Sequence, residues 1–165
     1  MRADDADRKA AREQFLPAVR SVYSLAQTDR HAIPYTDGHV KGFLPAYPFT
    51  PAQSKGTIVF FGGFDSYIEE LMQAFFYLRD AGYEVIAFQG PGQGGALNEA
   101  GLPMTAEWHK PVKAVLNYFQ VDRVTSSGFQ WWEVSYSAPR LSGRALSALL
   151  PMVFLPTSWM SIFVR

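Results

Sequence analysis

Two glycine-rich stretches hold the residues of this chain whose types and spacing could do chemistry. The first is Gly62-Gly63-Phe64-Asp65, which follows an apolar run. Two glycines after a buried strand let backbone amides face a ligand, and the amino terminus of a following helix adds positive potential. Amides placed in this way stabilise the oxyanion of an acyl-transfer intermediate. The alternative is a tight turn that needs glycine only for its dihedral angles, and Asp65 is either a helix cap or a site residue.

The second stretch is Gly90-Pro91-Gly92-Gln93-Gly94-Gly95, which fits the pattern G-x-G-x-x-G. In dinucleotide-binding folds this loop opens a long helix whose amino end holds the pyrophosphate. Here only about one helical turn is available before Gly101 and Pro103, and Pro91 removes one amide. A ligand-lining or structural loop is therefore favoured over a nucleotide site. With Gly62 and Gly63, we take Gly90 and Gly92 as candidate substrate-binding residues.

Both loops belong to a predicted βαβ unit. The run 57–61 is short, apolar and bounded by glycines, as is typical of a strand buried between two layers, and 83–88 is a second such strand. Between them, apolar residues recur at helical spacing, with Ser66 as the expected cap and Gly82 as the end of the helix. Open α/β sheets bind ligands at the carboxyl ends of their strands, where both loops lie.

The remaining elements are predicted from periodicity and turn residues. We expect an amphipathic helix over 4–27, a hairpin over 32–47 with its turn at 36–39, a helix over 105–119 capped by Thr105, and a third strand that opens at 121–125. Glu69 and Glu70, in the first turn of the helix of the βαβ unit, are interpreted as partners of the helix dipole without a catalytic role. The predicted divisions are a helix over 1–30, a partial α/β domain over 31–125 and an irregular tail over 126–165.

Composition excludes several classes of function. The 165 residues carry no net charge and contain no cysteine, which argues against nucleic-acid binding, a disulfide framework and a thiolate metal site. The amino terminus lacks the apolar core of a signal peptide, so a cytoplasmic protein is expected. The apolar stretch 145–164 is interrupted by two prolines and is not interpreted as a membrane span. No metal and no cofactor are expected, and the oligomeric state is left open.

Three segments resemble α/β-hydrolases. They read F-G-G-F-D-S-Y-I-E-E from Phe61, A-G-Y-E-V-I-A-F-Q-G-P-G-Q-G from Ala81, and G-L-P-M-T-A-E-W-H-K-P-V-K-A-V-L-N-Y-F from Gly101. The most similar group contains the fermentation-respiration switch protein, dihydropseudooxynicotine hydrolase and dienelactone-hydrolase-like enzymes. The resemblance implies the amino-terminal half of an α/β-hydrolase fold, made of a helix, a β-hairpin and a parallel βαβα segment. It also implies that an oxyanion-hole amide falls on Phe64 or its neighbours.

The chain departs from this family after Thr125. The family continues into a nucleophile elbow, G-x-S-x-G, with an acid and a histidine further on, but this sequence has no such elbow and no histidine after His109. A one-base shift of the coding frame at Thr125 explains the tail. The shifted frame permits L-I-G-I-S-M-V-G and then R-A-A-A-F, similar to the elbow and its helix apart from one forced valine. This hypothesis puts the lost nucleophile at the position of Gln130.

The resemblance implies a serine-type hydrolase that acts on a small molecule with an ester, amide or activated carbon–carbon bond, through an acyl-enzyme. The chain itself is expected to be an inactive fragment. Two alternatives stay open. The chain is either a non-catalytic module that binds small anions at Gly62–Asp65 or a dinucleotide-binding module that uses Gly90–Gly95.

Overall fold

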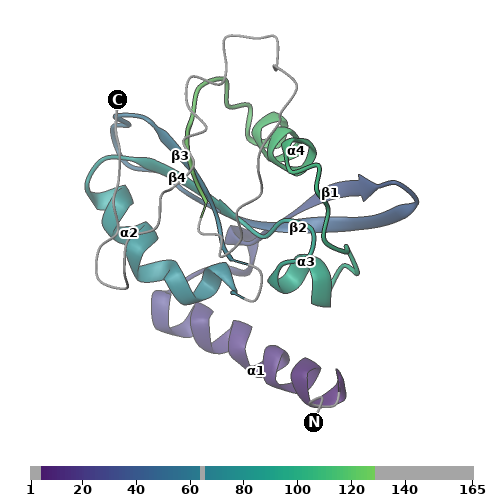
Figure 1. Cartoon of the computed structure of the whole chain (residues 1–165). Coiled ribbons are helices and arrows are strands. Elements are labelled where there is room, and N and C mark those ends of the chain that lie inside the picture. The colour runs from purple at the N-terminus through teal and green to yellow at the C-terminus, as the bar shows by residue number, and fades with distance from the viewer. Residues whose placement is uncertain (1–4, 64–65, 129–165) are drawn as a thin grey trace, which may run out of the picture.

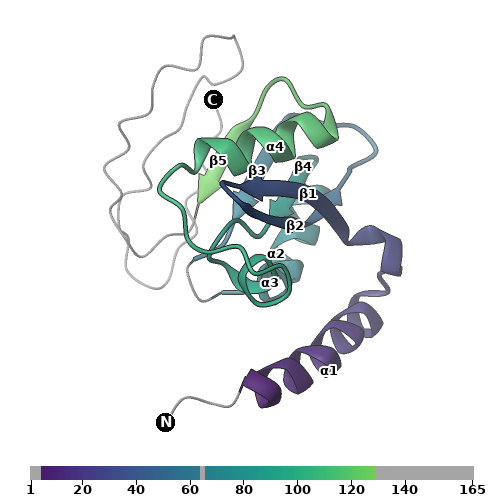
Figure 2. The ribbon, with the colours of Figure 1, turned by 90° about the vertical axis from the view of Figure 1, so that its right-hand side faces the viewer.

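A computed structural model of the chain describes residues 5–63 and 66–128 (Figure 1). The helices and strands in chain order are α1 (Asp5–Tyr23), the 3-10 turn η1 (Gln27–Asp29), β1 (His31–Asp37), β2 (Val40–Phe49), β3 (Thr57–Phe61), the 3-10 turn η2 (Ile68–Leu71), α2 (Met72–Asp80), β4 (Glu84–Phe88), α3 (Gly94–Asn98), α4 (His109–Phe119) and β5 (Thr125–Gly128). Figure 2 shows α1 leading into β1 through η1. Within the described ranges, no helix combines the length and the apolarity needed to cross a membrane.

The strands form one mixed sheet in the order β1-β2-β4-β3-β5. The first two strands pair antiparallel as a hairpin, and β2 also pairs antiparallel with β4. The hairpin turns at Gly38, whose φ of +57° is a conformation that suits glycine. In contrast, β3 runs parallel to both β4 and β5. The predicted fold class is therefore confirmed, because the helix, the hairpin and the parallel βαβα segment are all present.

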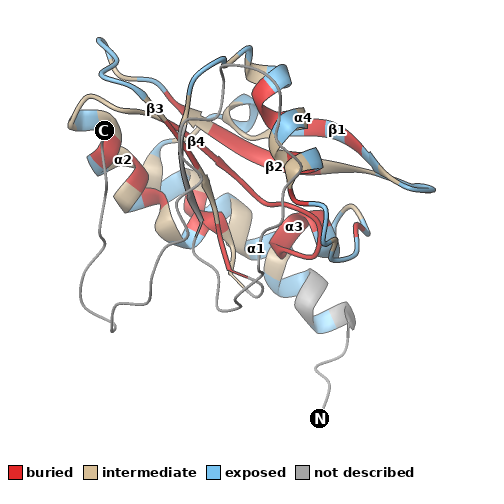
Figure 3. Cartoon of the chain, turned by 45° about the horizontal axis from the view of Figure 1, so that its top comes forward, coloured by how far each residue is buried: buried red, intermediate tan, exposed pale blue. Residues whose placement is uncertain are grey.

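Two apolar layers enclose the sheet, because successive side chains of a strand point to opposite faces. In β4, Val85 and Ala87 pack on the side of α1 and α2, whereas Ile86 and Phe88 pack on the side of α4. Figure 1 shows α4 on one side of the sheet and α1 and α2 on the other. Burial is concentrated in the central strands and in the helix faces turned towards them (Figure 3). The continuous apolar runs of β3 and β4 reflect this burial on both faces.

The third parallel strand exists, but its predicted position was wrong. We expected it to open at 121–125, whereas β5 covers Thr125–Gly128 and pairs with β3 from Ile58 opposite Thr125 to Phe61 opposite Gly128. Residues 126–128 thus belong to the sheet and not to the tail. Their serines and glycine carry no strand signal, and only pairing with β3 identifies them. The rest of the tail, including Gln130 and the stretch 145–164, lies outside the described residues.

Both predicted helix caps were also wrong. The turn η2 starts after Tyr67, and the hydroxyl of Ser66 donates instead to the carbonyl of Gly63 at 3.2 Å. Helix α4 starts after Trp108 without a side-chain cap, and Thr105 Oγ1 accepts from the backbone amide of Glu107 at 3.2 Å. Serine and threonine stabilise local turns by the same hydrogen bonds that they use as caps, so sequence alone does not separate the two uses.

Candidate functional site

The two predicted loops meet at the carboxyl edge of the sheet. Gly62 and Gly63 follow β3, the loop from Gln89 to Gly95 follows β4, and Gly128 ends β5 beside Phe61. Because these three strands are parallel, their carboxyl ends lie at one edge. The loops are in direct contact, since the side-chain amide of Gln93 donates to the carbonyl of Gly62. Phe64 and Asp65 lie outside the described residues, so their oxyanion-hole role stays a prediction.

The glycine loop after β4 is buried, and most of its backbone amides donate hydrogen bonds within the protein. All of its residues from Gly90 to Gly95 are buried. Four of its backbone amides donate to protein acceptors, as follows: Gly90 to Gln93 Oε1 at 2.9 Å, Gly92 to the Leu102 carbonyl at 2.9 Å, Gln93 to the Gly90 carbonyl at 3.0 Å, and Gly95 to Gln89 Oε1 at 2.6 Å. Helix α3, which follows, has five residues. A dinucleotide site needs free amides and a long helix, so this geometry does not fit one.

Gly90 and Gly92 have packing reasons to be glycine. A Cβ on Gly90 would lie 2.5 Å from the ring of Trp108, and one on Gly92 would lie 2.8 Å from the Met104 backbone. Gly92 also has φ of +82°, in the region that favours glycine. These contacts account for both glycines without a ligand. Their substrate-binding role stays a prediction.

Space rather than backbone conformation explains the glycine at position 62. Gly62 and Gly63 are not among the described glycines with positive φ. A Cβ on Gly62 would lie 2.4 Å from Ser66 Oγ, which is bonded to the carbonyl of Gly63. A side chain at position 62 would therefore displace the Ser66 hydroxyl from its hydrogen bond to Gly63.

Replacing Gly62 by alanine should lower the free energy of unfolding by about 0.5–1.5 kcal/mol, because the added methyl group displaces the Ser66 hydroxyl from its hydrogen bond to the Gly63 carbonyl. Ser66→Ala removes the hydroxyl that the methyl group meets. The double variant should then be less destabilised than the sum of the two single variants, as measured by urea denaturation. Strict additivity would show that the two residues do not constrain each other.

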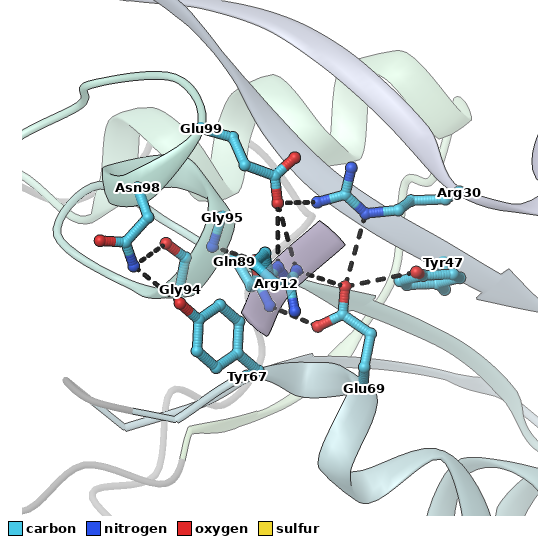
Figure 4. A network of polar contacts seen from close by, with 10 residues as sticks. All are labelled: Arg12, Arg30, Tyr47, Tyr67, Glu69, Gln89, Gly94, Gly95, Asn98 and Glu99. Atoms are coloured by element: carbon cyan, nitrogen blue, oxygen red, sulfur yellow. Dashed lines mark hydrogen bonds and ion pairs between the residues drawn. The ribbon is translucent and has the colours of Figure 1, made fainter. Parts of the chain in front are cut away.

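A buried network of charged and polar groups is bonded to the glycine loop (Figure 4). At its centre is Glu69, whose side chain is fully buried. Its carboxylate contacts four side chains: Arg12 Nη2 at 3.0 Å, Tyr47 Oη at 3.3 Å, Gln89 Nε2 at 2.7 Å and Arg30 Nε at 3.4 Å. Glu99, the C-cap residue of α3, contacts both arginines, Arg12 at 3.2 Å and Arg30 at 2.8 Å. Two positive and two negative groups therefore balance each other.

This network joins four parts of the chain to the site. Arg12 comes from α1, Arg30 precedes β1, Glu69 lies in η2, and Gln89 directly follows β4. The guanidinium of Arg12 also lies over the ring of Tyr67, 4.1 Å from its centre. Since Gln89 Oε1 accepts from the Gly95 amide, the network ends on the glycine loop. It fixes the amino-terminal helix and the loop to one buried carboxylate.

The interpretation of Glu69 as a partner of the helix dipole missed this role. Its actual partners are side chains up to 57 residues away in the sequence. One signal could have found it: Glu69 precedes the buried Met72 by three residues, a spacing that puts two helical side chains on the same face. Glu70 is exposed, as a partner of the dipole would be.

Tyr47 should make the stability of the chain sensitive to alkaline pH. Burial and the carboxylate of Glu69 raise the pKa of Tyr47, and burial raises the pKa of Tyr35 to about 12. The unfolded chain releases such protons near pH 10, at about the usual tyrosine pKa, while the folded chain keeps them. The stabilisation is therefore fully present below about pH 10 and is lost as the pH rises through the folded-state pKa values.

Urea denaturation at a series of alkaline pH values checks this expectation. The free energy of unfolding should fall above about pH 10, by at most about 1.4 kcal/mol per pH unit for each tyrosine. Tyr47→Phe should reduce this slope, whereas Tyr77→Phe, at a side chain that is 68% exposed, serves as the control. An unchanged slope in Tyr47→Phe would contradict the assignment.

Known proteins resemble the chain in sequence and in fold. Hydrolase pyiE of Pyricularia grisea is 35% identical over 152 residues, which cover 79% of this chain and 31% of that protein. Alpha/beta hydrolase psoB of Aspergillus fumigatus is 36% identical over 94 residues, covering 52% of this chain and 20% of that protein. The crystal structure of 2,6-dihydroxy-pseudo-oxynicotine hydrolase has a TM-score of 0.58 at 19% identity, covering 76% of this chain and 37% of that one. No protein-family model matches the sequence.

The parallel strands β4, β3 and β5, with helices on both faces of the sheet and the hairpin beside β4, match part of an α/β-hydrolase fold. Together with the curated hydrolases that the chain resembles, this fold supports an α/β-hydrolase superfamily. The matched segments make up less than a third of the length of the two curated relatives. The chain thus corresponds to a part of these proteins.

Proposed function

We propose that the described part of the chain is the oxyanion side of a serine-type hydrolase site. The observation that carries this proposal is the position of the turn at Gly62 and Gly63. It follows β3 and lies beside the carboxyl end of β5, which is parallel to β3. A nucleophile elbow follows a strand at this edge in α/β-hydrolases. Amides of the turn would then face the carbonyl that the nucleophile attacks.

The proposed reaction cleaves an ester, an amide or an activated carbon–carbon bond through an acyl-enzyme. The nucleophile adds to the substrate carbonyl, whose electron pair moves to oxygen, and backbone amides stabilise the resulting oxyanion. Collapse expels the leaving group, and water then releases the acyl group. The turn supplies only the stabilising amides, so the nucleophile, its base and the orienting acid must come from elsewhere.

We further propose that the polypeptide of 165 residues does not complete this reaction. It contains no G-x-S-x-G and no histidine beyond His109. Under the frameshift hypothesis, the nucleophile would have stood at the position of Gln130. The nucleotide sequence of the transcript across Thr125 tests this directly: read one base upstream after that codon, it should encode L-I-G-I-S-M-V-G and then R-A-A-A-F.

A fluorophosphonate probe, which labels activated serines, measures catalytic competence. We expect no labelling of the purified chain, because none of its serines stands in an elbow. Hydrolase activity on a chromogenic acyl ester should stay at the buffer rate. Stoichiometric labelling of any serine would show that the chain assembles a working nucleophile in another way. A serine hydrolase of known activity, treated in parallel, shows that the probe is reactive.

Binding of a small anion without catalysis is the second candidate function. In this candidate function the Gly63 amide is the donor to the anion, and no backbone hydrogen bond found between described residues uses it. Titration of the chain with phosphate, followed by the amide signal of Gly63 in NMR, tests this candidate. A parallel titration with NADH tests the dinucleotide alternative, for which we expect no binding because four amides of the Gly90–Gly95 loop already donate to protein acceptors.

A further inference from the structure

Gln93 links the two loops of the candidate site and is almost fully buried, at 1% exposure. Its Oε1 accepts from the Gly90 amide at 2.9 Å, and its Nε2 donates to the carbonyl of Gly62. The orientation of this side-chain amide follows from its partners. A backbone N–H can only donate and a carbonyl can only accept, so the oxygen must face Gly90 and the nitrogen must face Gly62.

The bond to Gly62 fixes the direction of a second group. In a planar trans peptide, the carbonyl of one residue and the amide of the next point in opposite directions. When Gln93 holds the Gly62 carbonyl towards the β4 loop, the Gly63 amide points away from that loop. The next carbonyl, that of Gly63, is held separately by the amide of Ser66 at 3.4 Å and by its hydroxyl at 3.2 Å. Two consecutive peptides of the turn are thus oriented by named donors.

Gln93 can orient the turn only if its own position is fixed. Its backbone amide donates to the Gly90 carbonyl at 3.0 Å, and its carbonyl accepts from the Leu97 amide of α3 at 3.0 Å. The other end of the loop is held where Gln89 bridges the Gly95 amide and the buried carboxylate of Glu69. The donor that faces Gly62 is therefore supported by the same network that anchors α1.

We propose that Gln93 is a positioning residue that orients the Gly63 amide for binding an oxyanion. This proposal rests on the proposed function of the turn, because an oriented amide has a catalytic meaning only if an oxyanion develops beside it. The side chain of Gln93 acts through the Gly62–Gly63 peptide and is not proposed to touch the substrate. It explains why a buried glutamine, rather than an apolar residue, occupies the glycine loop.

The sequence offers a clean NMR test of this proposal. Gly62-Gly63 and Gly94-Gly95 are its two Gly-Gly pairs. A chain labelled with glycine that carries both ¹³C at the carbonyl and ¹⁵N therefore gives two peaks in an HNCO spectrum. One peak correlates the Gly63 amide with the Gly62 carbonyl, which is the acceptor of Gln93. The other correlates the Gly95 amide with the Gly94 carbonyl and serves as an internal reference.

Gln93→Glu is the decisive variant. Its carboxylate still accepts from Gly90 but cannot donate to Gly62, so the Gly63 peak should move while the Gly95 peak moves less. Acidification protonates the introduced carboxyl group and restores a donor, and the Gly63 peak should then return towards its wild-type position. Gln93→Met, which donates at no pH, should show the displaced peak without this return. A role in packing alone would not produce the pH-dependent return.

Asn98→Asp is the matched control. Asn98 Nδ2 donates to the Gly94 carbonyl at 2.8 Å, so this amide-to-acid change should move the Gly95 peak and leave the Gly63 peak in place. A Gly63 peak that is unchanged in folded Gln93→Glu at every pH would overturn the proposal. The measurement requires no turnover, so it is independent of the fluorophosphonate result that tests the proposed function.

Discussion

Glu69→Gln is expected to lower the free energy of unfolding by about 3–5 kcal/mol, the usual cost of removing one partner from a buried charge cluster. The side chain of Glu69 is fully buried between Arg12 and Arg30, which are 10% and 13% exposed. Glutamine has the same shape but carries no charge, and one end of its amide can only donate. The two arginines would then share only Glu99, and Gln89 Nε2 or Tyr47 Oη would lose an acceptor.

Urea denaturation followed by circular dichroism measures this loss, and Glu70→Gln is the matched control. It makes the same chemical change one residue later, at an exposed side chain, and should alter stability by less than about 0.5 kcal/mol. Equal effects of the two substitutions would show that the network contributes nothing beyond surface charge. Because Arg12 holds α1 to this cluster, Glu69→Gln should also expose α1 to protease before the sheet unfolds.

Trp108→Ala is expected to be similarly destabilising, by about 3–5 kcal/mol, because it leaves a cavity the size of an indole ring. Trp108 is 6% exposed and stacks on Phe61, with ring centres 5.0 Å apart and an angle of 25° between the rings. Its ring also covers Gly90. The substitution should therefore weaken the packing of both the end of β3 and the glycine loop, which are the two parts of the candidate site.

A double-mutant cycle with Gly90→Ala tests whether Trp108 acts on the glycine loop through its contact with Gly90. On its own, Gly90→Ala should cost about 1–3 kcal/mol, because the new methyl group would overlap the indole ring. In the Trp108→Ala background that overlap is absent, so the same substitution should cost much less. Trp108→Phe, which keeps an aromatic ring, should be milder than Trp108→Ala. Additive costs across the cycle would mean that the two residues are not in contact.

The elements that could be predicted from the sequence are those that local chemistry specifies. The hairpin was found from Asp37-Gly38 between apolar runs, and the βαβ unit from two short apolar strands that flank a helical period. Gly82, with φ of +94°, ends α2 as expected. In each case neighbouring residues in the chain decide the structure. The resemblance to α/β-hydrolases rests on the same segments.

The features that sequence reasoning missed depend on partners far away in the chain. Glu69 is buried because Arg12 approaches it from α1, and a short-range pattern does not contain that contact. In the strand β5, the two serines and the glycine that follow Thr125 carry no strand signal and are identified only by their pairing with β3. Gln93 was read as part of a glycine motif, whereas its side chain bonds to a carbonyl 31 residues earlier. Tertiary contacts decided all three.

The order of the strands has a consequence for synthesis on the ribosome. The strands β1, β2, β4 and β3 pair with one another using only residues 31–88, and β5 is added beside β3 without separating any earlier pair. A nascent chain can therefore complete four strands before Thr125 is translated, in keeping with the tendency of amino-terminal parts to fold first during synthesis. If the reading frame changes after that codon, the altered residues meet four strands that are already paired. The change then affects only the strand that is added at the outer edge of the sheet, beside β3.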